Sequence, residues 1–153
     1  MANTYTQIHI HAVFAVQNRI SLIKTDWQQR LFHYIIAIVQ NHGHKVLSIG
    51  GMPDHVHLLF GFRPTQSLSD LMQHAKRNSS EWINKEKFVM GQFSWQEGYG
   101  AFSYSKSQIS QVAKYIENQE AHHKKRTFIE EYKKILIDFG LEYDERYIFK
   151  HVE

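Results

Sequence analysis

The sequence contains no cysteine and no apolar run of the roughly 20 residues that a membrane-spanning helix requires. The absence of cysteine excludes disulfide bonds, thiolate zinc sites and cysteine nucleophiles. The first residues also lack the basic region and apolar core of a signal peptide. We therefore expect a soluble, cytoplasmic protein without a membrane partner.

Repeats, low-complexity stretches and linkers are absent as well, so residues 1–153 are interpreted as a single domain. Apolar residues make up 42% of the chain, which is typical of a globular protein rather than a disordered one. The formal charge of +3 permits a polyanionic partner without requiring one. Eleven histidines are unusual for this length, and their spacing has to indicate which of them are functional.

Hydrophobic periodicity and capping signals predict an alternation of strands and helices. Strands are predicted at residues 5–16, 45–50, 55–62 and 100–104. Helices are predicted from the Thr25–Gln28 capping box to Gly43, from the Ser67–Asp70 box to about Lys87, over about 107–122, and from the Thr127–Glu130 box through Phe139. The order β-α-β-β-α-β with additional C-terminal helices indicates an α+β, ferredoxin-like fold. In that fold an antiparallel sheet carries two helices on one face, and we expect the other face to be open.

Two His-x-His pairs are predicted on this second face. In the third strand, Val56 and Leu58 belong to the face that packs on the helices, so the period of two places His55 and His57 together on the other face. Their Cβ atoms are expected to lie about 7 Å apart along the strand, a span that two imidazoles can close around one metal ion. His9 and His11 share that face of the first strand but do not follow a Gly-Pro turn, so they are interpreted as supporting residues or as facing a nucleic acid.

Two histidines need a third ligand, with positions left for water and substrate. The predicted helix 107–122 presents Tyr115 and Gln119 one turn apart on the same side. A phenol has a pKa near 10 and is a poor nucleophile unless a metal polarises its target. Two histidines and an amide suit Mg²⁺ or Mn²⁺, although imidazole also binds zinc and nickel.

The segment GMPDHVHLLF, with His55 and His57, resembles the His-hydrophobic-His motif of the HUH endonucleases. The segment KYIENQ, with Tyr115 and Gln119, resembles the Tyr-x-x-x-Gln helix of the single-tyrosine HUH transposases of the insertion sequence 200/605 class. WQEGYGAFS at 95–103 is similar to segments of the same group. The resemblance in motif order, spacing and expected fold covers nearly the whole chain.

The resemblance implies a transposase that cuts and rejoins single-stranded DNA at the hairpin ends of a mobile element through a 5′-phosphotyrosine intermediate. It implies that Tyr115 is the nucleophile and that His55, His57 and Gln119 bind Mg²⁺ or Mn²⁺. It further implies a homodimer in which the tyrosine helix of one subunit completes the histidine site of the other.

Basic residues near aromatic ones suit a single strand, where phosphate pairing and base stacking contribute together. The candidate DNA-binding residues are Arg19, Lys76, Arg77, Trp95, Lys106, Lys114, Lys124, Lys125 and Arg126.

Three other functions are compatible with these residues. A domesticated relative would nick DNA without moving an element. A non-catalytic module on an RRM-like sheet predicts aromatic residues on the open face, where this chain has histidines. A metal-dependent phosphodiesterase that uses a bound hydroxide would leave Tyr115 structural, and a Tyr115→Phe variant would then still cleave.

Overall fold

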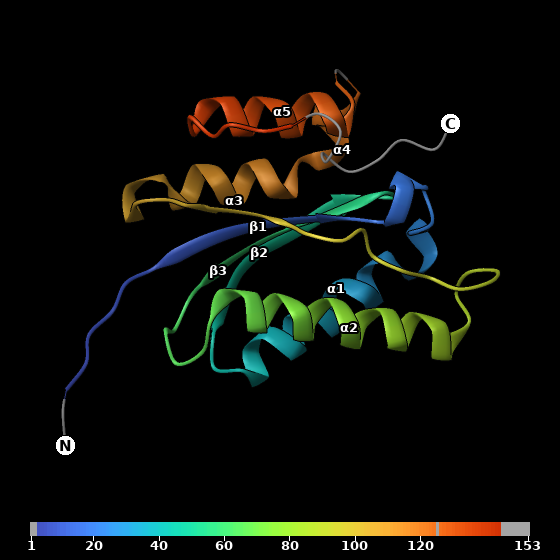
Figure 1. The fold of residues 1–153 in the computed structure, drawn as a ribbon, viewed down its shortest axis with the longest axis horizontal. Helices are drawn as coiled ribbons and strands as arrows, with labels where there is room; N and C mark the ends of the chain where they lie inside the picture. Colours follow the sequence, from blue (N-terminus) through green and yellow to red (C-terminus); the bar gives the residue numbers. More distant parts are fainter. Residues whose placement is uncertain (1–2, 125, 145–153) are drawn as a thin grey trace.

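The computed structural model describes residues 3–124 and 126–144, which form one sheet between two layers of helices (Figure 1). Neighbouring strands are antiparallel, in the order β2-β3-β1-β4. The strands are β1 (His9–Ala15), β2 (Lys45–Met52), β3 (His55–Gly61) and β4 (Gly100–Ser103). The helices are α1 (Thr25–Asn41), α2 (Leu68–Glu86), α3 (Ile109–Glu117), α4 (Gln119–His123) and α5 (Phe128–Asp138), with short 3₁₀ turns at Gln17–Arg19 and Lys106–Gln108. This arrangement confirms the predicted α+β fold class.

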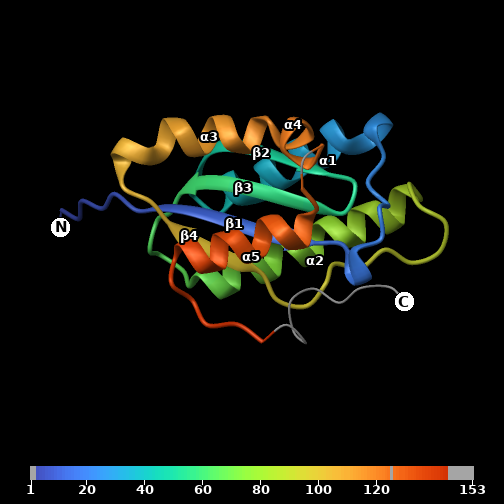
Figure 2. The same ribbon diagram turned by 90° about the horizontal axis from the view of Figure 1, so that it is seen from above.

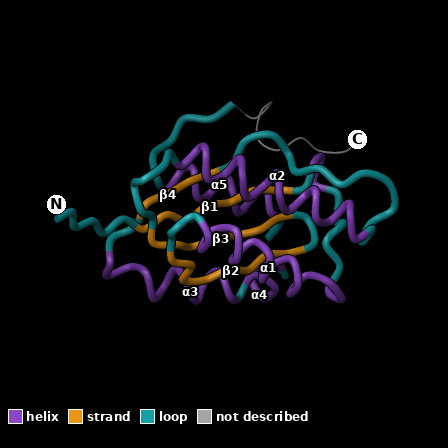
Figure 3. The backbone as a smooth tube through the Cα atoms, turned by 90° about the horizontal axis from the view of Figure 1, so that it is seen from below, coloured by secondary structure: helices purple, strands orange, loops and turns teal. Residues whose placement is uncertain are grey.

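The larger core lies between the sheet and helices α1 and α2, which cross its strands side by side (Figure 3). Alternate residues of the central strands, such as Phe14, Leu58 and Phe60, are fully buried in this core. Leu31 and Leu71 belong to the apolar faces of α1 and α2 that meet them. The alternate apolar residues of the strands therefore pack against the two helices, as the period of two predicted.

The expectation of an open second face is wrong, because α3 and α4 cover β2 and β3 while α5 lies over β1 and β4 (Figure 2). Val13 and Ala15 are apolar on this face as well, and they form a second core with Phe128 and Tyr132 of α5. A strand that is apolar on both faces is normally covered on both. The segment HAVFAV shows this pattern, and the apolar stripes of the C-terminal helices provide the cover.

Glycine allows α3 to approach β2 closely. A Cβ atom at Gly50 would overlap the backbone carbonyl of Ile116, and the Ser48 hydroxyl donates to the carbonyl of Ala113 at 3.2 Å. Helix α3, which carries Tyr115, is thereby held in one position on the sheet.

Several predicted element boundaries change. The strand predicted from residue 5 begins at His9, and the helix predicted over 107–122 is interrupted at Asn118, whose backbone leaves the helical conformation. The Thr25–Gln28 capping box is not formed, because Thr25 is already the first residue of the helix. The side-chain amide of Gln28 donates instead to the backbone carbonyl of Gly51 at 3.4 Å.

The other predicted helix boundaries agree with the structure. The hydroxyls of Ser67 and Thr127 accept hydrogen bonds from the amides three residues later, and Gly43 and Gly140 have the positive φ typical of a helix end. Within the described ranges, none of the helices combines the length and the apolar character that crossing a membrane would require.

Candidate active site

The His55–His57 pair lies on β3 beneath α3, α4 and α5, with both side chains fully buried. The two rings are 5.1 Å apart in an edge-to-face arrangement, and the ring of Phe128 stacks on His55 at 4.0 Å. His57 is paired with Val13 of β1, so the pair stands at the centre of the sheet. The predicted sharing of one face by the two histidines is therefore present, although α5 buries that face.

Both imidazoles are oriented by a hydrogen bond at Nδ1. His55 Nδ1 donates to Asp54 Oδ1 at 2.7 Å, and His57 Nδ1 lies 2.8 Å from His11 Nε2. Burial by itself would raise the pKa of Asp54, but the hydrogen bond and positive field of His55 lower it. A carboxylate or ring that holds Nδ1 in this way directs Nε2 toward a metal, as in many metalloproteins.

The Nε2 atoms of the pair converge on Glu131, a residue of α5 that the sequence analysis missed. Glu131 Oε1 lies 3.0 Å from His57 Nε2 and 3.6 Å from His55 Nε2. The ligand atoms of these three residues all lie within 4.8 Å of one another. The sequence did contain a signal, since Glu131 occupies the buried face of α5 beside Phe128 and Tyr132, where a carboxylate is rare without a partner.

Gln119 and His123 complete the cluster from α4. Gln119 Oε1 is 3.0 Å from His55 Nε2, and its amide nitrogen donates to Glu131 Oε2 at 3.2 Å. His123 Nε2 lies 3.1 Å from Gln119 Oε1 and 3.2 Å from Glu131 Oε1. The structure thus brings the predicted third ligand, Gln119, to the histidines and adds two groups that were not predicted.

Tyr115 reaches the same cluster from α3, where its hydroxyl donates a hydrogen bond to Glu131 Oε2. Burial raises the pKa of the Tyr115 phenol, and the hydrogen bond and negative charge of Glu131 raise it further. Tyr115 also lines a cavity of about 300 Å³ together with His11, Arg126 and Lys134. The hydroxyl is therefore an un-ionised phenol that lies beside the cluster and at the wall of a cavity.

The protonation of the cluster suits a cation. Burial lowers the pKa of His57 to about 4 despite the opposing charge of Glu131. Burial would raise the pKa of Glu131, but the hydrogen bonds from His123, His57 and Tyr115 hold it far below the usual range. Two imidazoles, an amide oxygen and a carboxylate then form a donor set of nitrogen and oxygen atoms that fits a divalent metal ion.

The candidate DNA-binding residues are distributed over several surfaces. The exposed ones are Arg77 on α2, Lys106 and Lys114 around α3, and Lys124 and Arg126 between α4 and α5. Arg126 lines the cavity beside Tyr115. Arg19 is half-buried in a left-handed turn, and Lys125 lies outside the described residues.

Two of these candidates have structural roles instead. Trp95 is only 7% exposed and packs edge-on against Phe14 while its indole N–H donates to Ser79 at 2.9 Å. Its ring is not available to stack on a base, which corrects the prediction. Lys76 donates to the carbonyls of Gln96 and Gly98 at 2.7 Å and thereby holds the loop that leads to β4.

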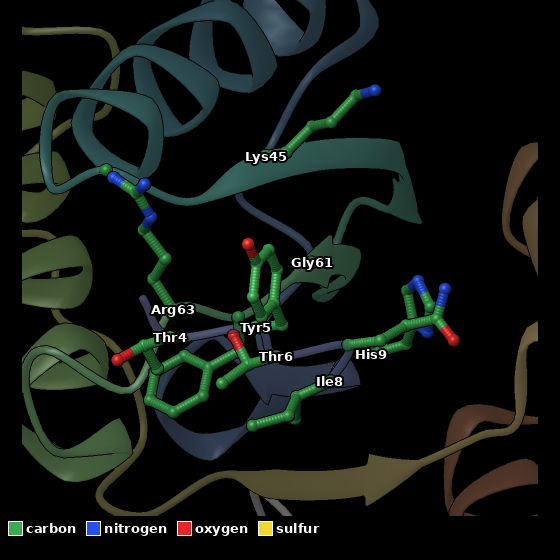
Figure 4. A pocket seen from close by; sticks show the side chains of 11 residues that line it. Thr4, Tyr5, Thr6, Ile8, His9, Lys45, Gly61 and Arg63 are labelled. Carbon is green, nitrogen blue, oxygen red and sulfur yellow. The ribbon is translucent and has the colours of Figure 1, made fainter. Parts of the chain in front are cut away.

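The second His-x-His pair is divided between two places. His11 is buried beside His57, as expected for a supporting residue. His9 instead lines a separate cavity with the N-terminal segment, Lys45 and Arg63 (Figure 4).

Comparison with known proteins gives a consistent result. The model of the family described as "Transposase IS200 like" matches residues 4–119. The chain is 29% identical over 119 residues to the ISDra2 transposase TnpA of Deinococcus radiodurans, covering 74% of this chain and 84% of that one.

Two solved structures share the fold. A candidate transposase of Deinococcus radiodurans R1 has a TM-score of 0.63 at 22% identity and covers 78% of this chain and 95% of that one. A REP-associated tyrosine transposase bound to a REP hairpin has a TM-score of 0.56 at 16% identity, with 76% and 68% covered.

Proposed function

The chain belongs to the family of IS200-like transposases, and on that premise we propose that it cuts and rejoins single-stranded DNA at the ends of a mobile element. Tyr115 is the nucleophile, and a divalent metal ion is bound by His55, His57 and Gln119 with Glu131. The element ends are hairpins, by analogy with the REP hairpin bound to one relative.

The observation that carries this proposal is the convergence of Tyr115, Gln119 and the histidine pair on Glu131. Four elements of the fold, β3, α3, α4 and α5, supply these groups to one buried point, and the cavity beside the phenol adjoins it. A structural tyrosine can satisfy its hydroxyl with any single hydrogen-bond partner. The partner of Tyr115 is Glu131, the same carboxylate that both histidines approach.

When bound, the metal would polarise the phosphodiester and neutralise the charge that develops on its oxygens. The Tyr115 oxygen attacks the phosphorus, and the bond from phosphorus to the 3′-oxygen breaks. The products are a 5′-phosphotyrosine ester and a free 3′-hydroxyl. The phenol proton passes to water in the cavity beside Tyr115, because the lowered pKa of Glu131 makes that carboxylate a poor base, and the leaving oxygen is protonated from water.

The ester retains the energy of the broken bond, so a new 3′-hydroxyl can displace Tyr115 without a nucleotide cofactor. In the absence of substrate, the raised pKa of Tyr115 keeps the phenol unreactive.

A denaturing gel tests the proposal with single-stranded DNA from the regions flanking the gene, in the presence of Mn²⁺ or Mg²⁺. We expect a slowly migrating covalent adduct that requires metal and is absent from the Tyr115→Phe variant. Tyr132→Phe is a matched control, because Tyr132 is a buried tyrosine of α5 that belongs to the second core and not to the group of residues around Glu131 proposed for catalysis.

The alternative outcomes are distinct. Cleavage by Tyr115→Phe at an undiminished rate would show hydrolysis by a bound hydroxide. Adduct formation without rejoining would indicate a nickase, and binding without cleavage would leave only a DNA-binding module.

A further inference from the structure

A second cavity, of about 420 Å³, lies where three strands of the sheet end together. His9 of β1, Gly61 of β3 and Lys45 of β2 are successive cross-strand partners there. The segment before β1 forms one wall, and Arg63, just after β3, contributes another (Figure 4). None of the groups proposed for catalysis lines this cavity.

The cavity is basic. Lys45 and Arg63 are exposed cations that line it, and neither forms an ion pair with any residue that the structure describes. No carboxylate is among the described residues of its wall. Such a site attracts an anion, since a lysine or arginine forms its strongest hydrogen bonds with a phosphate or carboxylate.

The position of Arg63 is held by the residues beneath it. The backbone N–H of Arg63 donates to Nδ1 of the buried His44 at 2.9 Å, and His44 Nε2 lies 2.8 Å from the amide oxygen of Gln66. His44 also stacks on Phe62 at 5.0 Å. The backbone of Arg63 is therefore fixed before a ligand binds, so less conformational entropy is lost when the guanidinium becomes ordered on the ligand.

An aromatic ring is exposed in the same place. Tyr5 is 89% exposed, although it belongs to a chain with two packed cores, and Thr4 and Thr6 beside it offer hydroxyls. Cations combined with an exposed aromatic ring bind single-stranded nucleic acid, because phosphates pair with the cations while a base stacks on the ring.

The two cavities are neighbours along β1. His11 lines the cavity beside Tyr115, and His9, two residues away on the same face, lines the basic one. Along β3, the seven residues from His55 to Gly61 are separated by six steps and span about 20 Å. This distance corresponds to about six stacked nucleotides at 3.4 Å each, or fewer in an extended strand.

We propose that this cavity, which we call the Tyr5–Arg63 site, binds the single DNA strand that continues from the cleavage site. Lys45 and Arg63 bind its phosphates and Tyr5 stacks on one of its bases, without reading sequence. This proposal rests on the proposed function and assigns a second contact to the same substrate.

The test compares binding of fluorescein-labelled oligothymidylates of 16 and 2 nucleotides with Mg²⁺ present, all in the Tyr115→Phe background. The 2-mer is too short to span the distance of about 20 Å from the histidine pair to Gly61, even when it is extended. We expect Lys45→Ala/Arg63→Ala to lose most of the advantage of the 16-mer, and its slope of log K against log salt to fall by about 1.4 for two lost phosphate contacts. Tyr5→Ala should weaken 16-mer binding about tenfold, because one stacked base is lost.

The double variant Lys24→Ala/Lys85→Ala is the control, since both lysines are exposed and line neither cavity. Equal 16-mer affinity and salt slope in the Lys45/Arg63 and control variants would overturn this inference while leaving cleavage by Tyr115 intact. No binding of either oligonucleotide by the parent protein would overturn the inference and the proposed function together.

Discussion

Glu131 is the residue on which the polar groups of the site depend. It accepts hydrogen bonds from Tyr115, from the Gln119 amide and from His57, while the His55 Nε2 atom lies 3.6 Å away. A buried carboxylate with this many cationic or donor partners stays ionised, and its low pKa reflects that. The proposed metal site therefore includes a negative charge that a set of two histidines and one amide lacks.

The change Glu131→Gln removes this charge at nearly constant volume, and we expect it to weaken Mn²⁺ binding at least tenfold. The physical reason is that a hard divalent cation prefers an anionic oxygen ligand to an amide. Isothermal titration calorimetry at neutral pH measures the effect. Glu130→Gln, on the exposed side of the same helix turn, is the control, and equal affinities in the two variants would exclude Glu131 as a ligand.

At this scale the sequence predicted part of the site. His55 and His57 follow from the period of two in a single strand, and Tyr115 with Gln119 from the spacing of a single helix segment. Glu131 and His123 join the site only through the packing of α4 and α5, which no local pattern specifies. The carboxylate on the apolar face of α5 was nevertheless a usable signal, because burial of an acidic group requires partners.

At the scale of elements, α3 connects the fold to the chemistry. It presents Tyr115 because it lies directly on β2 at Gly50, where only a hydrogen fits between the strand and the Ile116 carbonyl. The strands, the existence of the helices and the layer formed by α1 and α2 were predictable from periodicity and capping. The break at Asn118 and the covering of the second face were not, because both depend on how the C-terminal helices meet the sheet.

The change Gly50→Ala should separate α3 from β2, because its Cβ would occupy the position of the Ile116 carbonyl. Overpacking of this kind costs about 1–3 kcal/mol, and we expect urea unfolding to show a loss of that order. The rate of adduct formation should also fall under conditions in which the variant remains folded, because Tyr115 moves with the helix. Gly61→Ala is the control for stability, since its Cβ would have only ordinary contacts with Lys45. Equal losses of stability in the two variants would contradict this account of α3.

At the scale of the whole molecule, the groups of the proposed site meet within the single chain that the structure describes. Tyr115 of α3 meets Glu131 of α5 and His57 of β3 within the same subunit. The resemblance noted in the sequence implied instead a homodimer with sites shared between subunits. A dimer remains a prediction, but the tight contact at Gly50 and the hydrogen bond from Ser48 to Ala113 favour a tyrosine helix that stays on its own sheet.

Mixing two inactive variants distinguishes these arrangements. One variant, Tyr115→Phe, keeps the metal ligands, and the other, His57→Ala, keeps the nucleophile. If each chain builds its own site, the mixture forms no more adduct than either variant alone, because no subunit contains both parts. If the tyrosine helix crosses to the partner, mixed dimers contain one intact site, and about half of the dimers formed by random exchange recover adduct formation. We expect no recovery, measured on a denaturing gel after the variants have been unfolded and refolded together, with refolded wild-type protein alongside to show that the procedure preserves activity.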